Sequence, residues 1–220
     1  MTADGGSVTG DAGDQEMNET RVMTLNNVTP AARAVYRVLV GELLTSGAVA
    51  DAQALAWQTG LGVDEIPDAL AELSSADWIG RATGGQIVAI YPFSPAATAI
   101  IVQFDGLERY AMCAVDALGV APMLDQPVQI RAQCPTCLAA IQIAARPDRI
   151  ALRHPPSTIV IRRRSSGPAH LNRCSATRFA CSPEHAQSWI DTNGGPDDVL
   201  QSLEVSFREA RELFGHRATA

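Results

Sequence analysis

Residues 78–91 read Trp-Ile-Gly-Arg-Ala-Thr-Gly-Gly-Gln-Ile-Val-Ala-Ile-Tyr, with Thr83-Gly84-Gly85 between two apolar runs. Short apolar runs on either side of a glycine-rich turn predict a β-hairpin. Apolar residues have helical spacing before this hairpin and β-strand patterns after it. The hairpin therefore marks a change from helical to β-rich structure along the chain.

The region before the hairpin has the signals of three helices. Thr29-Pro30 is a helix start, because threonine caps a helix and proline suits its first position. Apolar residues then recur at helical spacing until Gly47, a typical helix stop. A second helix is predicted over Asp51 to Thr59 and a third over Val63 to Leu73.

Three helices followed by a hairpin are the pattern of a winged helix. In DNA-binding members of that class the third helix enters the major groove. Here that helix carries four acidic residues and no arginine or lysine, which opposes contact with phosphates. We therefore expect a winged-helix-like module used for packing.

Beyond Ser94 to Ala97, which we interpret as a linker, the chain is rich in short β-strand patterns. Together the two regions predict an α+β fold. Strands are expected over Thr98–Gln103, Val128–Ala132, Ala139–Ala144, Thr158–Arg162 and at Phe179-Ala180, and helices over Leu107–Leu118, from Ser182 onward and over Val199–Phe214.

Composition excludes several classes of protein. A net charge of −7 disfavours a nucleic-acid-binding surface, and no apolar run is long enough to span a membrane. Residues 1–27 are rich in Gly, Asp, Thr and Asn and lack the apolar core of a secretory signal, so we expect a disordered leader. Five cysteines without an export signal predict a cytoplasmic location and thiols that bind metal, react or pack.

Cys113 and Asp116 lie three residues apart, and on a helix this spacing puts both side chains on one face. A lone helical cysteine is most often a buried apolar residue. A carboxylate on the same buried face would cost several kcal/mol if it were charged and unpaired. This pair is therefore a candidate functional site.

The remaining cysteines admit another interpretation, a structural zinc site. Cys134-Pro135-Thr136-Cys137 is a turn suited to tetrahedral zinc, and Cys174 with Cys181 would complete four sulfur ligands. The wide spacing of the second pair argues against it. A thioredoxin-like redox role is weaker still, because a strand rather than a helix is predicted after the CxxC turn.

Tyr110-Ala111-Met112-Cys113-Ala114-Val115-Asp116-Ala117-Leu118 resembles the active-site segment of the organomercurial (alkylmercury) lyases. The resemblance extends over about residues 28–214 and includes the positions of four further landmarks: Cys134, Cys174, Phe179 and Trp189. It implies a winged-helix-like domain over 28–93 and a β-rich catalytic domain with flanking helices over 94–220, and it leaves the expected leader over 1–27 outside the match. Several residues depart from the family pattern: Cys137, Ala180, Cys181 and Arg162-Arg163-Arg164.

The resemblance implies a specific chemistry. Cys113 and Cys174 would bind the mercury of an organomercury substrate as thiolates, and Asp116, beside the metal, would deliver a proton to the leaving carbon. The products would be a hydrocarbon and Hg(II) held by the two sulfurs. No organic cofactor is expected; low-molecular-weight thiols would release the metal, with a mercuric reductase as a further partner.

Two non-catalytic alternatives remain open from the sequence. One is a metal-binding or metal-sensing protein with a cysteine zinc or mercury site. The other is a relative of the lyases that sequesters mercury without cleaving a bond. Neither the preferred organic group nor the roles of Cys137 and Cys181 follow from the sequence.

Overall fold

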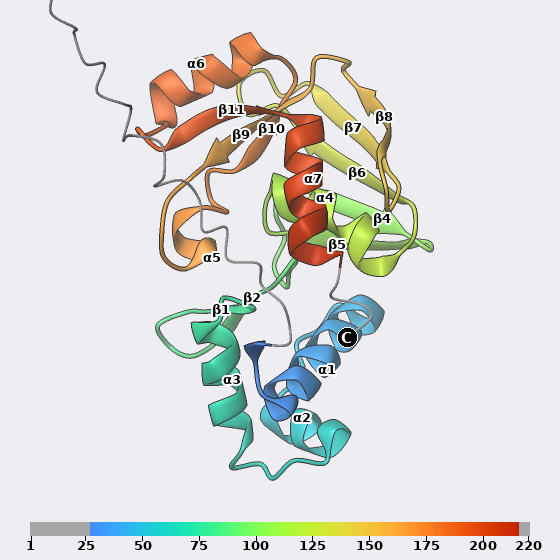
Figure 1. Ribbon diagram of the computed structural model, residues 1–220, viewed down its shortest axis with the longest axis vertical. Helices are drawn as coiled ribbons and strands as arrows, with labels where there is room; N and C mark the ends of the chain where they lie inside the picture. Colours follow the sequence, from blue (N-terminus) through green and yellow to red (C-terminus); the bar gives the residue numbers. More distant parts are fainter. Residues whose placement is uncertain (1–26, 216–220) are drawn as a thin grey trace, which may run out of the picture.

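The computed structural model describes residues 27–215, so the predicted leader lies almost wholly outside the described residues. Three helices form the N-terminal region: α1 (Pro30–Ser46), α2 (Ala52–Thr59) and α3 (Ile66–Ser75) (Figure 1). Thr29 caps the first helix through its side chain, and Gly47 ends it in the left-handed conformation with φ 75°. The predicted starts and stops of α1 and α2 are thus confirmed, whereas α3 begins three residues later than predicted.

The predicted hairpin is present as β1 (Ile79–Arg81) and β2 (Ile87–Ile90). The linker expected at Ser94 to Ala97 is wrong in its first residue, because β3 (Phe93–Ser94) pairs with β2 on one side and with β5 on the other. Phe93 is fully buried, which explains why this short segment joins the sheet. One antiparallel sheet therefore runs from the N-terminal hairpin into the rest of the molecule.

The large sheet has the strand order β1-β2-β3-β5-β4-β6-β7-β8. Its remaining strands are β4 (Ile101–Phe104), β5 (Leu107–Ala111), β6 (Val128–Gln133), β7 (Ala140–Ala145) and β8 (Ile150–His154). The helix predicted over Leu107–Leu118 is wrong in its first half, because residues 107–111 pair with β4 as strand β5. Long-range pairing overrides local propensity at this point.

A second antiparallel sheet has the order β10-β9-β11, from β9 (Ile159–Arg163), β10 (Arg178–Ala180) and β11 (Asp198–Ser202). The short α5 (Ala169–Asn172) precedes β10 and α6 (Pro183–Asn193) follows it. The final helix is shorter than predicted, because residues 198–202 form β11 and only Leu203–Phe214 form α7. Ser202 caps α7, so the strand ends where the helix begins.

Helix α4 (Ala114–Leu124) lies at the centre of the C-terminal region, packed against α7 and strands of both sheets (Figure 1). Residues 114–123 are all buried. Gly119 allows the close approach of α7, because a Cβ atom at this position would lie 2.2 Å from Cδ2 of Phe214. The packing fixes α4, whose first turn carries the candidate site. None of the helices within residues 27–215 is long and apolar enough to cross a membrane.

Candidate metal-binding active site

Cys113 and Asp116 lie at the start of α4. Cys113 is the residue that caps the helix, with extended backbone angles of φ −155° and ψ −179°, and Asp116 is in the first turn. Both side chains are buried. The two residues were predicted to share a face within a helix; instead they meet across its first turn, where the positive end of the helix dipole favours negatively charged groups.

Cys174 reaches this helix end from a separate segment, between α5 and β10. The Cys174 amide donates to Ala169 O at 2.8 Å, and the Ala114 amide donates to Thr177 O at 3.3 Å. The second bond ties the start of α4 to the segment that carries Cys174. Cys174 Sγ donates to Asp116 Oδ2 at 3.5 Å. The structure thus brings together the three predicted residues, and their ligand atoms all lie within 4.8 Å of one another.

The electrostatics of this group favour a protonated Cys174. Its hydrogen bond with Cys113, its burial and the negative charges of Cys113 and Asp116 raise the pKa of the Cys174 thiol well above its ordinary value of 9.0. A proton therefore resides on this sulfur at neutral pH, in contact with the carboxyl group.

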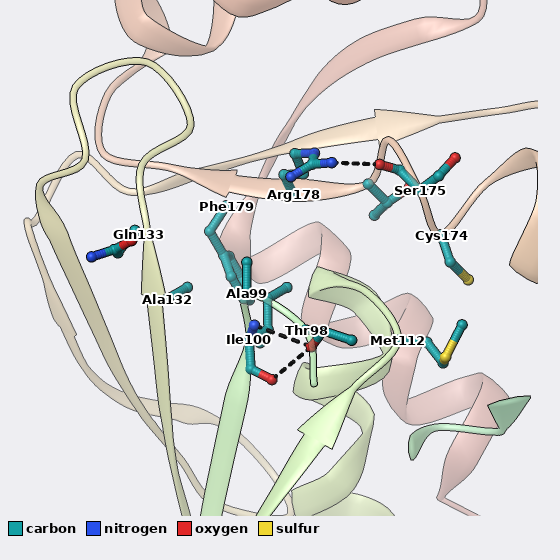
Figure 2. A pocket seen from close by; sticks show the side chains of 11 residues that line it. Thr98, Ala99, Ile100, Met112, Ala132, Gln133, Cys174, Ser175, Arg178 and Phe179 are labelled. Atoms are coloured by element: carbon teal, nitrogen blue, oxygen red, sulfur yellow. Dashed lines mark hydrogen bonds between the residues drawn. The ribbon is translucent and has the colours of Figure 1, made fainter. Parts of the chain in front are cut away.

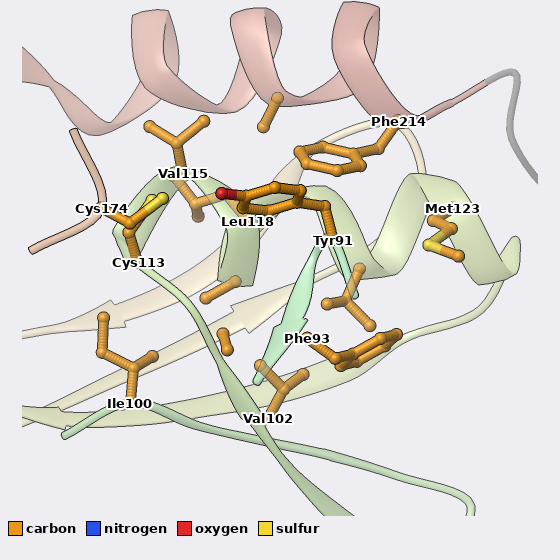
Figure 3. Packing of buried hydrophobic residues seen from close by; sticks show 14 of the residues in the cluster. Tyr91, Phe93, Ile100, Val102, Cys113, Val115, Leu118, Met123, Cys174 and Phe214 are labelled. Carbon is orange, nitrogen blue, oxygen red and sulfur yellow. The ribbon is translucent and has the colours of Figure 1, made fainter. Parts of the chain in front are cut away.

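Tyr91, at the end of the N-terminal hairpin, also faces the group and was missed by the sequence analysis. Figure 3 shows its hydroxyl end directed towards Cys113 and Cys174. Burial, followed by the charges of Cys174 and Asp116, raises the pKa of Tyr91 well above its ordinary value. The phenol therefore stays neutral beside the thiols. Its place at the end of a hairpin strand gave no sequence signal of this proximity.

A pocket of about 140 Å³ opens beside Cys174. Figure 2 shows Cys174 and Met112 at one end and Ala132 and Gln133 at the other. The remaining lining residues are Thr98, Ala99, Ile100, Ser175, Thr177, Arg178 and Phe179. The pocket is of a size for a small organic group and gives access to one of the two buried sulfurs.

The other three cysteines gather elsewhere, with a residue that the sequence analysis did not single out. Cys134, Cys137, Cys181 and His185 place their ligand atoms within 4.8 Å of one another. The four-cysteine zinc site considered from the sequence is therefore wrong in its composition, since Cys174 lies with Cys113 and Asp116 and His185 takes the fourth place. The Cys181-x-x-x-His185 spacing is the sequence signal that could have revealed it.

The thiols of this second group differ in acidity. Burial opposes the thiolate of Cys134, but hydrogen bonds from the backbone amides of Cys181, Cys137 and Thr136 outweigh it and lower the pKa of Cys134 to about 6. Burial and hydrogen bonds to Cys134 and Cys137 raise the pKa of Cys181 to about 12.

Two buried thiols against a carboxyl group, at the end of a buried helix in an α+β fold, form a donor set suited to a soft metal, because thiolate ligands select such metals. The family model for alkylmercury lyase (MerB) matches residues 93–215. The chain therefore belongs to the alkylmercury lyase family, and the enzyme class predicted from the sequence is confirmed.

Individual relatives agree with this assignment. The chain is 26% identical over 183 residues to an alkylmercury lyase of Staphylococcus epidermidis, with 81% of each chain covered. It is 27% identical over 187 residues to that of Bacillus cereus, with 83% of this chain and 81% of the relative covered. The crystal structure of the mercury-bound form of MerB2 shares the fold, with a TM-score of 0.73, 20% identity, and 88% of this chain and 94% of that chain covered.

Proposed function

We propose that this protein cleaves the carbon–mercury bond of organomercury cations by protonolysis, with Cys113, Cys174 and Asp116 as the reacting groups. Cleavage of organomercurials is the general activity that the family assignment supports. The protonolysis mechanism rests on one observation: the Cys174 thiol contacts the Asp116 carboxyl group at 3.5 Å, beside Cys113.

The order of events follows from the proton that Cys174 holds. Cys113 binds the mercury of R–Hg⁺ first, as a thiolate. Cys174 then binds the same mercury, and its proton passes along the hydrogen bond to Asp116. Two thiolates add electron density to mercury, which weakens its bond to carbon. Asp116 transfers the proton to the carbon as that bond breaks, giving R–H and Hg(II) held by two sulfurs.

The surroundings of the three residues suit this reaction. The pocket beside Cys174 would receive the organic group, with Ile100, Met112 and Phe179 as apolar contacts. The neutral Tyr91 phenol adds no charge to compete for the proton. The thiols and the acid supply all the groups that the reaction uses, so the proposal includes no organic cofactor.

Release of Hg(II) from two buried sulfurs requires competing thiols. We propose that low-molecular-weight thiols, or the cysteines of a mercuric reductase, accept the metal in the cytoplasm. The N-terminal region, over 28–93, would act as a winged-helix-like scaffold rather than a DNA-binding module. It contacts the catalytic region, over 94–220, through β3 and through Asp77, whose carboxylate binds Arg173 at 2.8 Å.

The test separates bond cleavage from metal binding. Asp116→Asn keeps the shape of the buried side chain but cannot deliver a proton. We expect it to bind one mercury per chain while hydrocarbon release from phenylmercury falls by about 10²–10⁴-fold. Asp105→Asn, in an exposed turn, is the matched control.

Headspace chromatography for the hydrocarbon and mass spectrometry for bound mercury give the two measurements. Full hydrocarbon release by Asp116→Asn would remove the acid from the mechanism. Stoichiometric mercury binding by the wild-type protein without any hydrocarbon release would show the alternative function, sequestration.

A further inference from the structure

Cys134, Cys137, Cys181 and His185 take no part in the proposed reaction, yet their side chains are arranged like the ligands of a metal ion. Cys137 Sγ is 3.6 Å from Cys181 Sγ, and Nδ1 of His185 is 2.9 Å from Cys181 Sγ and 3.9 Å from Cys134 Sγ. Tetrahedral zinc with ordinary bond lengths separates two sulfurs by about 3.8 Å and a sulfur from a nitrogen by about 3.6 Å. The four atoms therefore need only small shifts to surround one ion.

Two of the four residues, Cys134 and Cys137, lie in a turn between β6 and β7 that backbone hydrogen bonds hold in place. In Cys134-Pro135-Thr136-Cys137, the Leu138 amide donates to Cys134 O and the Cys134 amide to Ala139 O, both at 2.9 Å. Leu138 adopts φ 62°, a left-handed conformation unusual for leucine. The amides of Thr136 and Cys137 donate to the Cys134 sulfur. A turn that directs backbone N–H groups at a sulfur stabilises a metal thiolate.

The other half comes from the second sheet. Cys181 directly follows β10, and His185 lies in the first turn of α6, where Ser182 caps the helix. Thr136 Oγ1 donates to His185 O at 2.7 Å, so a hydrogen bond holds the turn against the helix apart from any ion. Ser157 Oγ donates to Cys181 O at 2.7 Å.

We propose that Cys134, Cys137, Cys181 and His185 bind one zinc(II) ion in a closed, tetrahedral structural site. Three sulfurs and one imidazole nitrogen are a common donor set for structural zinc. The three thiols lose their protons on binding, and Nδ1 of His185 is the coordinating nitrogen because it faces the sulfurs. Mercury(II) favours two sulfurs in a near-linear arrangement, so the closed four-donor group suits zinc better than the substrate metal.

Such an ion would join the two sheets close to the reacting group. Cys134 and Cys137 belong to the β6–β7 turn of the large sheet, whereas Cys181 and His185 follow β10 of the small one. The segment carrying Cys174 leads directly into β10. Zinc therefore fixes the strand that places the second mercury ligand, without contacting the substrate.

The experiment measures zinc rather than activity. The protein is produced in zinc-supplemented medium, purified under reducing conditions without chelator, and its metal content measured by mass spectrometry. We expect about one zinc per chain in the wild type and in the control variants Cys113→Ser and His154→Gln. Cys137→Ser and His185→Gln should lose most of it; the Cys137 side chain is exposed, so its replacement leaves the core intact.

Cobalt(II) substitution provides a second measurement that needs no variant. Wild-type protein in which cobalt replaces zinc should show the intense visible bands of a tetrahedral ion and thiolate charge-transfer absorption in the near ultraviolet. Three results would overturn the proposal: no zinc or cobalt bound after reconstitution, full zinc retention in both ligand variants, or zinc loss in Cys113→Ser. All three results come from measurements of bound metal and none uses hydrocarbon release, so failure of this proposal can be distinguished from failure of the proposed function.

Discussion

The Asp77 carboxylate anchors the segment that carries Cys174 to the N-terminal region. Removing the negative charge of Asp77 should make this segment open more often, by a factor that can be calculated. Asp77 accepts from the Ala169 amide at 3.1 and 3.3 Å and from Arg173 Nη2 at 2.8 Å. Asp77→Asn keeps a side chain that tolerates the local φ of 58° but removes the negative charge.

The magnitude follows from these contacts. Hydrogen bonds involving a charged group contribute about 1.5–3 kcal/mol, and the partial exposure of this ion pair, 33% for Arg173 and 22% for Asp77, reduces that to about 1–2 kcal/mol. A loss of this size raises the population of locally opened molecules about 5–30-fold. Its hydrogen bond with Cys113 and its burial raise the pKa of Cys174, so the thiolate that reacts with an alkylating reagent forms mainly on such opening.

The assay is alkylation with iodoacetamide, with each cysteine followed by mass spectrometry of peptides. We expect Cys174 in Asp77→Asn to react about 5–30 times faster than in the wild type. Cys113, which caps the start of the buried helix α4, should change much less, and Asp105→Asn should change neither. Equal Cys174 labelling in Asp77→Asn and wild type would refute the anchoring role.

Three further changes probe the packing, the small sheet and the pocket. Gly119→Ala should lower the free energy of unfolding by about 1–3 kcal/mol, measured by chemical denaturation, because the added methyl group overlaps Phe214; unchanged stability would contradict the close contact. Asp198→Asn should cost about 1–3 kcal/mol at neutral pH by removing the paired bonds to Arg163. The hydrogen bond to Arg163 lowers the pKa of Asp198, so its stabilisation is present above the ordinary value of 3.8 and lost as the pH falls through the folded-state value; a stability difference from wild type that is the same at every pH would contradict this. Ala99→Phe, in the pocket wall, should reduce kcat/KM for phenylmercury at least about tenfold more than for methylmercury; equal losses would place the organic group elsewhere.

Local signals predicted much of the N-terminal region. Thr29, Gly47, Asp51 and Gly60 are caps whose effect depends on neighbouring residues, and the structure shows each in that role. Where pairing partners lie far along the chain, the prediction was less accurate. Residues 107–111 have no local pattern that excludes a helix, and only pairing with β4 makes them a strand.

In the candidate site too, the contact between residues near in sequence was predictable from local spacing, and the contact between distant segments was not. The proximity of Cys113 and Asp116 followed from their spacing, although they meet at a helix start rather than within a helix. Their meeting with Cys174 came from resemblance to a family, because no local rule brings together segments 58 residues apart. Tyr91 and His185 were missed because their partners are set by the packing of separate elements.

Hydrocarbon release by Cys113→Ser is the decisive measurement for the role of the two buried thiols in bond cleavage. Purified wild-type protein and the variant are incubated with phenylmercury in excess thiol, and benzene in the headspace is measured over time. We expect repeated turnover by the wild type and no benzene above the protein-free background from Cys113→Ser. Benzene release by the variant at the wild-type rate would contradict the proposal that the buried dithiol group carries out the reaction.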